Sequence, residues 1–223
     1  MSLILTAMAL AAQPAPSAPQ RPLPSEPPRA AEATPAHEIF YQDEGAPLNA
    51  EARGKLLEFG RCAAQRSPEM AARTLSMNFT TSAYRTGISQ LSRNNEGCLQ
   101  GARRMRGGGL LFAGALAEGL LGRGEAPLNV RLARAAAGAA TPAYSPSDRV
   151  AICVVRSVPD QVAGLLATAP ASDGEEAAIQ QLLPAFHLCA QNGPRISSNE
   201  AGLRAMLATA AFRSVGAETA RSN

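Results

Sequence analysis

The sequence contains no tryptophan, and aromatic residues make up only 4% of its 223 residues. A core with so few large rings must be built from Ala, Leu, Val and Met. Such a core suits closely packed helices better than a sheet, where aromatic and β-branched side chains are enriched. The lack of aromatics interleaved with basic residues also argues against a nucleic-acid surface.

Histidine is nearly as scarce, because only His37 and His187 are present. Zinc sites and Ser-His-Asp catalysis usually need histidine, so we expect no metal ligands, catalytic residues or cofactor of those kinds. The net charge of +3 is too small to indicate binding to nucleic acid or to a membrane. No apolar run reaches the 18 residues of a membrane-spanning helix.

Lysine occurs once, as Lys55, among 21 basic residues. We interpret this skew as the codon usage of a GC-rich genome rather than as a need for guanidinium groups. The bias toward arginine is therefore expected to carry no structural meaning.

Two segments precede the first predicted unit. Residues 1–12 are predicted to be a signal peptide, because an apolar stretch leads to Ala9-Leu10-Ala11, which fits the small-x-small cleavage pattern, although no basic residue comes first. Residues 13–45 are rich in Pro and Ala and are predicted to form a disordered leader. This leader is either a spacer from a membrane or cell wall, or a tolerated low-complexity extension.

The four cysteines form two pairs with the same spacing, Cys62 to Cys98 and Cys153 to Cys189, each 36 residues apart. Shifting the sequence by 91 residues superimposes both pairs. The same shift aligns further identical residues without a gap: Pro68 with Pro159, Leu75 with Leu166, Ile88 with Ile179, and Leu116–Ala117 with Leu207–Ala208. The pattern predicts a tandem duplication.

We therefore predict an all-α fold of two homologous units, each with about four short helices and one internal disulfide. The predicted boundaries are unit one at 46–122, a linker at 123–147, unit two at 148–215 and a disordered tail at 216–223. Alone, the run from Val150 to Val155 would indicate a buried strand, but its Ala-rich counterpart in unit one favours a helix.

Local signals mark several helix starts. Asn49 is a plausible N-cap, and Pro68 and Pro159 each suit the first position of a second helix. Ser172 with Glu175 forms a capping box that opens the third helix of unit two, as Ser197 with Glu200 does for the fourth. A proline within the third helix, Pro184, is expected to kink or interrupt it. The fourth helices are predicted near 109–121 and 199–213.

The cysteine spacing favours structural disulfides within each unit, Cys62–Cys98 and Cys153–Cys189, because each ancestral unit must have closed its own bond. Zinc binding, redox activity and a cysteine nucleophile remain alternatives, but each needs neighbours that the sequence does not offer at suitable spacing.

One basic cluster, Arg103, Arg104 and Arg106 followed by glycines, is a weak candidate for an anion site at a helix N-terminus. A solvated loop is the simpler interpretation. Glu118, together with Glu58 and Glu69, is interpreted as a surface residue. Glu175 and Glu176 are expected to complement a helix dipole.

The leading hypothesis is an exported, non-enzymatic binding or structural module of a bacterial cell envelope, periplasmic or extracellular. Its partner would be a macromolecule that the sequence does not identify. A small periplasmic carboxylate-dependent hydrolase is one alternative, which two acids facing each other in a pocket would favour. A carrier of a lipid or small apolar ligand is another, which an internal apolar cavity would favour.

Overall fold

The computed structural model describes residues 48–99, 108–191 and 198–222, and within them it is all-helical, with no strand. The elements are α2 (Ala50–Arg66), α3 (Pro68–Ser76), α4 (Ser82–Asn94), the 3₁₀ helix η1 (Glu96–Cys98), α5 (Gly109–Leu121), α6 (Leu128–Ala137), α7 (Pro146–Ser157), α8 (Pro159–Ala167), α9 (Asp173–Ala190) and α10 (Glu200–Ser222). The predicted signal peptide and leader, the cluster Arg103, Arg104 and Arg106, and the Ser197 cap lie outside the described residues.

Helix starts follow the local signals. The Asn49 side-chain oxygen accepts a hydrogen bond from the Ala52 amide at 2.8 Å and so caps α2. Pro68 and Pro159 occupy the first positions of α3 and α8, where a missing N–H costs nothing. The valine-rich run at Val150–Val155 is helical, within α7. Its β-branched side chains Val150, Ile152, Val154 and Val155 are all buried in the core, so tertiary packing overrides their preference for strands.

Helix starts also recur at a constant interval along the chain. Adding 91 to the first residues of α3, α4 and α5, which are 68, 82 and 109, gives 159, 173 and 200. These are the first residues of α8, α9 and α10. The helix α2 and the helix α7 each precede such a series.

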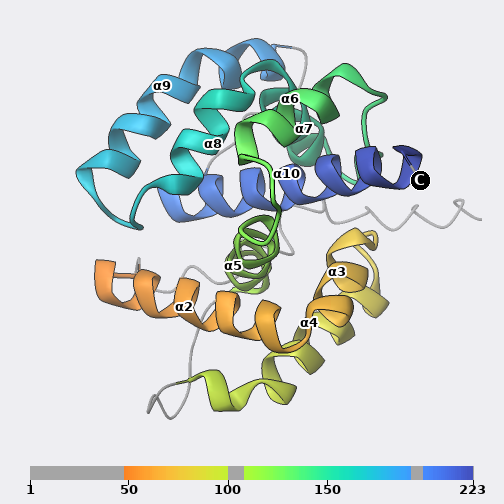
Figure 1. The fold of residues 1–223 in the computed structure, drawn as a ribbon. Coiled ribbons are helices and arrows are strands. Elements are labelled where there is room, and N and C mark those ends of the chain that lie inside the picture. Colours follow the sequence, from red (N-terminus) through yellow and green to blue (C-terminus); the bar gives the residue numbers. More distant parts are fainter. Residues whose placement is uncertain (1–47, 100–107, 192–197, 223) are drawn as a thin grey trace, which may run out of the picture. The chain divides into compact units, whose positions relative to one another are not determined.

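The core centres on α5, which packs against α2 on one side and against α10 on another (Figure 1). Every residue from Phe112 to Glu118 is buried. Close approach depends on glycine, because a Cβ atom at Gly60 of α2 would lie 2.3 Å from the Cβ of Ala115. Helices of Ala and Gly can therefore bury a core without large aromatic side chains, as the composition predicts.

The predicted linker at residues 123–147 contains a helix, α6. Its side chains Leu132 and Ala135 are buried, and it packs on α7, α8 and α10. We expected mainly linker in this Ala-rich segment, although it could also hold a short helix. The helix forms because its apolar face covers the second half of the chain.

The segment 216–222, which we predicted to be part of a disordered tail, is helical in the structure, because α10 runs to Ser222. Its buried residues continue as far as Arg213 and Ser214, so packing anchors the helix up to the edge of the segment. No proline follows that would stop it, and Gly216 weakens a helix without ending it.

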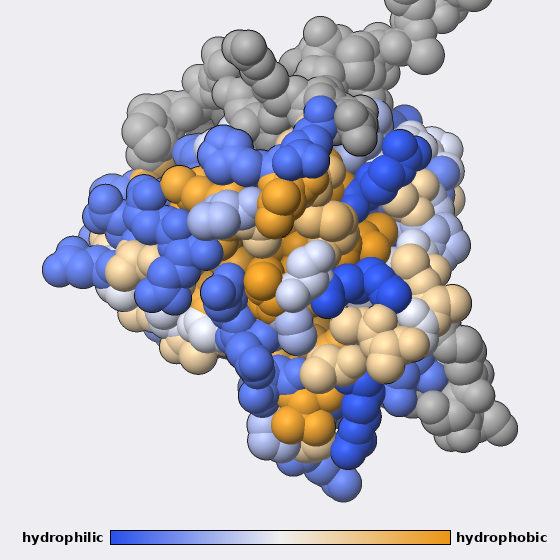
Figure 2. Space-filling model, turned by 90° about the horizontal axis from the view of Figure 1, so that it is seen from above, coloured by the Kyte–Doolittle hydropathy of each residue, from blue (hydrophilic) through white to orange (hydrophobic). Residues whose placement is uncertain are grey.

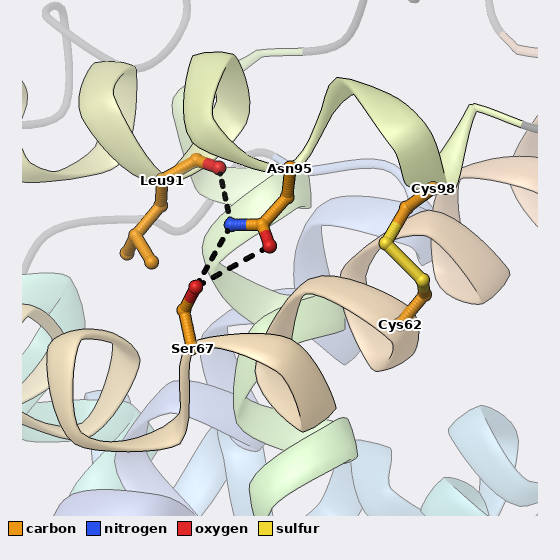
Figure 3. The surroundings of a disulfide bond; sticks show 5 residues. All are labelled: Cys62, Ser67, Leu91, Asn95 and Cys98. Carbon is orange, nitrogen blue, oxygen red and sulfur yellow. Dashed lines mark hydrogen bonds between the residues drawn. A yellow bond between two sulfur atoms is a disulfide. The ribbon is translucent and has the colours of Figure 1, made fainter.

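The third helices of the two halves end differently. In the second half, α9 continues through Pro184 to Ala190 instead of being interrupted there. In the first half, α4 ends at Asn94, and the buried Asn95 amide donates to the Leu91 carbonyl at 2.8 Å (Figure 3). That bond replaces the lost backbone bond, and the same amide also donates to the Ser67 hydroxyl at 3.2 Å.

Three arginines bind pairs of backbone carbonyls where helices end. Arg156 donates to Ala135 and Gly138 at the end of α6, at 3.0 and 2.8 Å. Two further arginines do the same beyond α8 and α5: Arg204 with Leu166 and Thr168, and Arg131 with Leu121 and Ala126. A guanidinium group there satisfies carbonyls that lack helical partners and complements the helix dipole.

Candidate functional site

Both disulfides are present with the pairing that the spacing predicts. Cys62 of α2 joins Cys98 of η1, and Cys153 of α7 joins Cys189 of α9. The Cα atoms are 5.8 Å apart in both bonds, well within the range of an unstrained bridge. All four cysteines are consumed in this way. None is left as a thiolate for zinc binding or nucleophilic attack.

The most highly charged buried cluster is built around Arg204 of α10, which is 4% exposed. Its Nε donates to Glu118 Oε1 at 2.7 Å and its Nη2 to Glu118 Oε2 at 2.9 Å. Its Nη1 donates to Glu175 Oε1 at 3.1 Å. One guanidinium therefore bridges carboxylates from α5 and α9, which are far apart in the sequence.

The second oxygen of Glu175 also has its own partners. Oε2 lies 2.6 Å from Nη2 of Arg53 in α2 and accepts the Ala171 amide at 2.8 Å. Ala171 has a φ of 56°, a left-handed conformation that costs an alanine about 1 kcal/mol. The carboxylate thus holds a strained turn as well as two arginines.

Burial disfavours the charge on Arg204, but its hydrogen bonds and attraction to Glu118 and Glu175 raise its pKa above the usual value. The guanidinium therefore stays charged, and together with Arg53 it balances the charges of the two acids. Since the oxygens of both carboxylates are occupied, the pair is arranged as counter-ions rather than as an acid and a base facing a substrate. Glu118 is buried, which corrects its interpretation as a surface residue.

A second cluster surrounds Arg213, also on α10. Its guanidinium pairs with Asp148 and donates to the Pro142 carbonyl at 3.1 Å. The guanidinium carbon lies 5.1 Å from the ring centroid of Tyr144 and 5.9 Å from that of Phe79, within cation–π range. Phe79 in turn meets Tyr84 edge to face at 6.4 Å.

The buried Tyr84 predicts sensitivity to alkali. Burial raises the pKa of its phenol well above the usual value of 10.0, against the opposing effect of Arg213. The unfolded chain therefore loses this proton at lower pH than the folded protein does. The contribution of Tyr84 to the free energy of unfolding is complete below pH 10 and is lost as the pH rises. At pH 11 the loss is about 1.4 kcal/mol. We expect urea midpoints measured from pH 8 to 11 to fall more for wild type than for Tyr84→Phe, and parallel curves would contradict this.

An open groove of about 500 Å³ lies beside the C-terminal end of α5. Three arginines line it, Arg61 of α2, Arg123 and Arg131, together with Glu118 and Glu125. The groove is of the size that small-ligand sites usually have. Arg61 belongs to α2, whereas Arg123 and Arg131 belong to the segment between α5 and α7, so the fold has to form before they meet.

The charges in this groove are only partly compensated. Arg61 approaches Glu118 at 3.5 Å, but Arg204 already binds both oxygens of that carboxylate. Within the described ranges, Arg123 and Arg131 have no carboxylate within 4 Å. Glu125 is exposed at the loop. The arrangement is suited to receive a negatively charged group.

The position of Arg131 depends on a glycine. A Cβ atom at Gly124 would lie 2.2 Å from its Nη1 atom, so the loop backbone can approach the guanidinium only without a side chain. Burial lowers the pKa of Arg131. The guanidinium is thus held against the loop, at the wall of the groove.

A smaller pocket, lined by Leu48, Leu56, Leu57 and Leu111 near Arg53, holds only about 40 Å³. That volume admits about one water molecule and no lipid chain. On the face that Figure 2 views from above, hydrophobic side chains gather toward the middle, with hydrophilic side chains around and between them. Among the residues that the structure describes, the exposed large hydrophobic side chains are Met77, Val130 and Leu188, which belong to three separate segments.

No single described helix is long and apolar enough to cross a membrane, and the pair α7 and α8, which would suffice together, is bent by 102° at its break. Among the described residues, no three His, Cys, Asp or Glu side chains gather in a way that could hold a metal ion. His187 is exposed on α9. Comparison of the chain with protein-family models, with curated proteins and with solved structures found no match in any of the three.

Sequence reasoning therefore missed both the buried cluster and the groove. One signal was available, since Glu118 is the only charged residue in α5, and an acid in so apolar a helix needs a buried partner. A second signal was Arg123, which lies between Gly122 and Gly124. This is the same pattern of arginine next to glycine that made Arg106 and Gly107 part of the predicted anion-site candidate. Neither signal identifies the partner residues, which come from other helices.

Proposed function

We propose that the protein is an exported, disulfide-stabilised binding module that receives an anionic group of a macromolecular partner in the arginine-lined groove. The observation that carries this proposal is the groove of about 500 Å³, in which Arg61, Arg123 and Arg131 outnumber the available carboxylates. Guanidinium groups bind carboxylate and phosphate with strong, charge-assisted hydrogen bonds.

Export is supported by the two disulfides, because such bonds persist in oxidising compartments and are rare in a reducing cytosol. A periplasmic or extracellular location in a bacterium is part of the proposal. There the covalent bridges would compensate for a core that is poor in large side chains.

A tandem duplication is also part of the proposal. The constant interval of 91 residues between helix starts supports it, as do two bridges of equal span. Backbone detail agrees as well: Ser67, before α3, has φ −134° and ψ 54°, while Val158, before α8, has −138° and 59°. Duplication of a binding scaffold enlarges its surface, and here the groove lies where elements of both copies meet.

The alternatives find less support in the geometry. A hydrolase needs two carboxylates that a substrate can reach, whereas Glu118 and Glu175 both have their oxygens bound by arginines. A carrier of lipid needs an apolar cavity far larger than the 40 Å³ beside Leu56.

Neutralising two groove arginines is expected to weaken anion binding strongly. We expect wild type to bind inorganic pyrophosphate or a hexaglutamate peptide saturably at low salt, and Arg61→Gln with Arg123→Gln to weaken that binding at least about tenfold, since each charge-assisted bond contributes about 1.5–3 kcal/mol. Isothermal titration calorimetry measures the affinities. Preference for one probe distinguishes a phosphate ligand from a carboxylate ligand.

The control removes the same charge elsewhere. Arg73→Gln with Arg93→Gln alters two exposed arginines of α3 and α4 that do not line the groove. This variant should bind both probes within about twofold of wild type if the site is local, because only long-range, salt-screened attraction changes. Equal losses in the two double variants, or no saturable binding by wild type, would exclude the groove as the site.

A further inference from the structure

A close contact between α5 and α10 joins two corresponding residues, Gly114 and Ala205. A Cβ atom at Gly114 would lie 2.6 Å from both the Cα and the Cβ of Ala205. These residues are 91 positions apart, the same interval that relates the helix starts of the two halves. In a pair of identical surfaces, a residue meets its own counterpart only on a twofold axis.

A second place obeys the same relation for one pair of residues, Arg53 and Pro170, which line one pocket and whose counterparts Tyr144 and Phe79 are in ring contact. Arg53 pairs with Glu175, and it lines the small pocket together with Pro170. The counterparts of these three residues, 91 positions away, are Tyr144, Tyr84 and Phe79. The rings of Tyr144 and Phe79 lie 5.8 Å apart, and those of Phe79 and Tyr84 lie 6.4 Å apart.

The reciprocity extends to whole elements. The start of α2 touches the start of α9, while the segment before α7 touches the segment before α4. A contact between one surface of the first half and a different surface of the second half is therefore found again with the two halves exchanged. The residues differ, ionic on one side and aromatic on the other. Tyr144 corresponds to Arg53, whereas Phe79 corresponds to Pro170, five residues before Glu175.

We infer that the contact between α5 and α10 is an isologous interface, so that the chain is a fused form of a symmetric dimer of the duplicated unit, with Gly114 and Ala205 on its axis. The inference rests on the duplication proposed above. The self-complementary surface is formed by α5 in one half and α10 in the other, and its natural partner is a second copy of the unit.

The axis has a steric consequence that can be tested in the full chain. Only one methyl group fits at the crossing, and Ala205 supplies it. If the two sides are equivalent, the methyl can be moved to the other helix by combining Gly114→Ala with Ala205→Gly. The helices would shift slightly to the arrangement that the twofold rotation relates to the first, which symmetric surroundings permit.

We expect Gly114→Ala alone to lower the midpoint of thermal unfolding by about 5–10 °C, because the added methyl overlaps α10. Ala205→Gly alone should lower it by about 2–4 °C, the effect of a helical glycine. The double variant should return to within about 4 °C of wild type. If Gly114→Ala does not fold, a folded double variant supports the inference and an unfolded one overturns it.

The matched control is another Gly–Ala crossing, between Gly60 of α2 and Ala115 of α5. These residues are not 91 positions apart, and a Cβ at residue 60 would also lie 2.7 and 2.9 Å from backbone atoms of Ala115 and Leu116. Exchanging them should give no recovery. The inference would be overturned if, at both crossings, the midpoint of the double variant falls by the sum of the two single losses. It would also be overturned if Gly114→Ala left the midpoint of thermal unfolding unchanged.

The outcome is separable from that of the proposed function. Pyrophosphate binding by the Gly114→Ala, Ala205→Gly double variant is measured alongside its stability. Binding without recovered stability would overturn the isologous interface and leave the groove intact. Recovered stability, with no saturable binding by wild type or by the double variant, would support the interface and overturn the groove.

Discussion

Reduction of both disulfides is expected to unfold the protein at 37 °C. Each bond closes a loop between cysteines 36 residues apart, and in the chain-entropy model such a loop contributes about 4 kcal/mol. Two such contributions approach the whole free energy of unfolding of a typical domain, about 5–15 kcal/mol. Because the core is poor in large side chains, its packing alone is not expected to replace the stability that the two disulfides contribute.

Far-UV circular dichroism with and without a thiol reductant measures this effect. The paired variants Cys62→Ser with Cys98→Ser, and Cys153→Ser with Cys189→Ser, separate the two bonds, and each should lose about 4 kcal/mol. Unchanged midpoints after complete reduction would refute the structural role. Alkylation of the native protein in its host adds a test of export, since four reactive thiols would place the chain in a reducing compartment.

Replacement of Arg204 by methionine is expected to destabilise the fold by about 3–5 kcal/mol. The substitution keeps much of the side-chain volume but leaves Glu118 buried with only Arg61 at 3.5 Å, and Glu175 with only Arg53. Removing one partner of a buried ion pair costs more than the pair contributes, because the remaining charge is unsolvated.

The matched variant is Arg61→Met, which removes another partner of the same carboxylate. That arginine is 48% exposed in its side chain, so water screens the pair and the loss should stay below about 1 kcal/mol. Adding Glu118→Leu to Arg204→Met should recover part of the stability, since the unpaired acid disappears. Urea denaturation measures all three, and equal small losses in the two arginine variants would contradict a buried network.

Local signals were sufficient to predict where many helices begin. The cap at Asn49 and the prolines at 68 and 159 act within one turn of the chain, and their effect survives folding. The disulfide pairing was predictable because the equal cysteine spacing indicates two copies of one unit, each of which closes its own bond. The helix at 146–157 needed comparison between the two halves, since its valines alone indicate a strand.

What could not be predicted depends on contacts between distant segments. The helix α6 forms against α8, and α10 is long because it packs on α5, α6 and α7. The bonds of Arg204 to Glu118 and of Arg53 to Glu175 span 86 and 122 residues. Nothing within one helical turn of these residues indicates which opposite charge each will meet.

The bias toward arginine has a structural use that codon usage does not explain. Arg131, Arg156 and Arg204 each clamp two carbonyl oxygens with a planar group. A lysine at these places would bring one tetrahedral ammonium, which cannot span both oxygens in the same geometry. Substitution of arginine by lysine should therefore be tolerated at most exposed positions and should destabilise the fold at these three helix ends. Even in a genome of different base composition, the protein would have to keep arginine at these three positions.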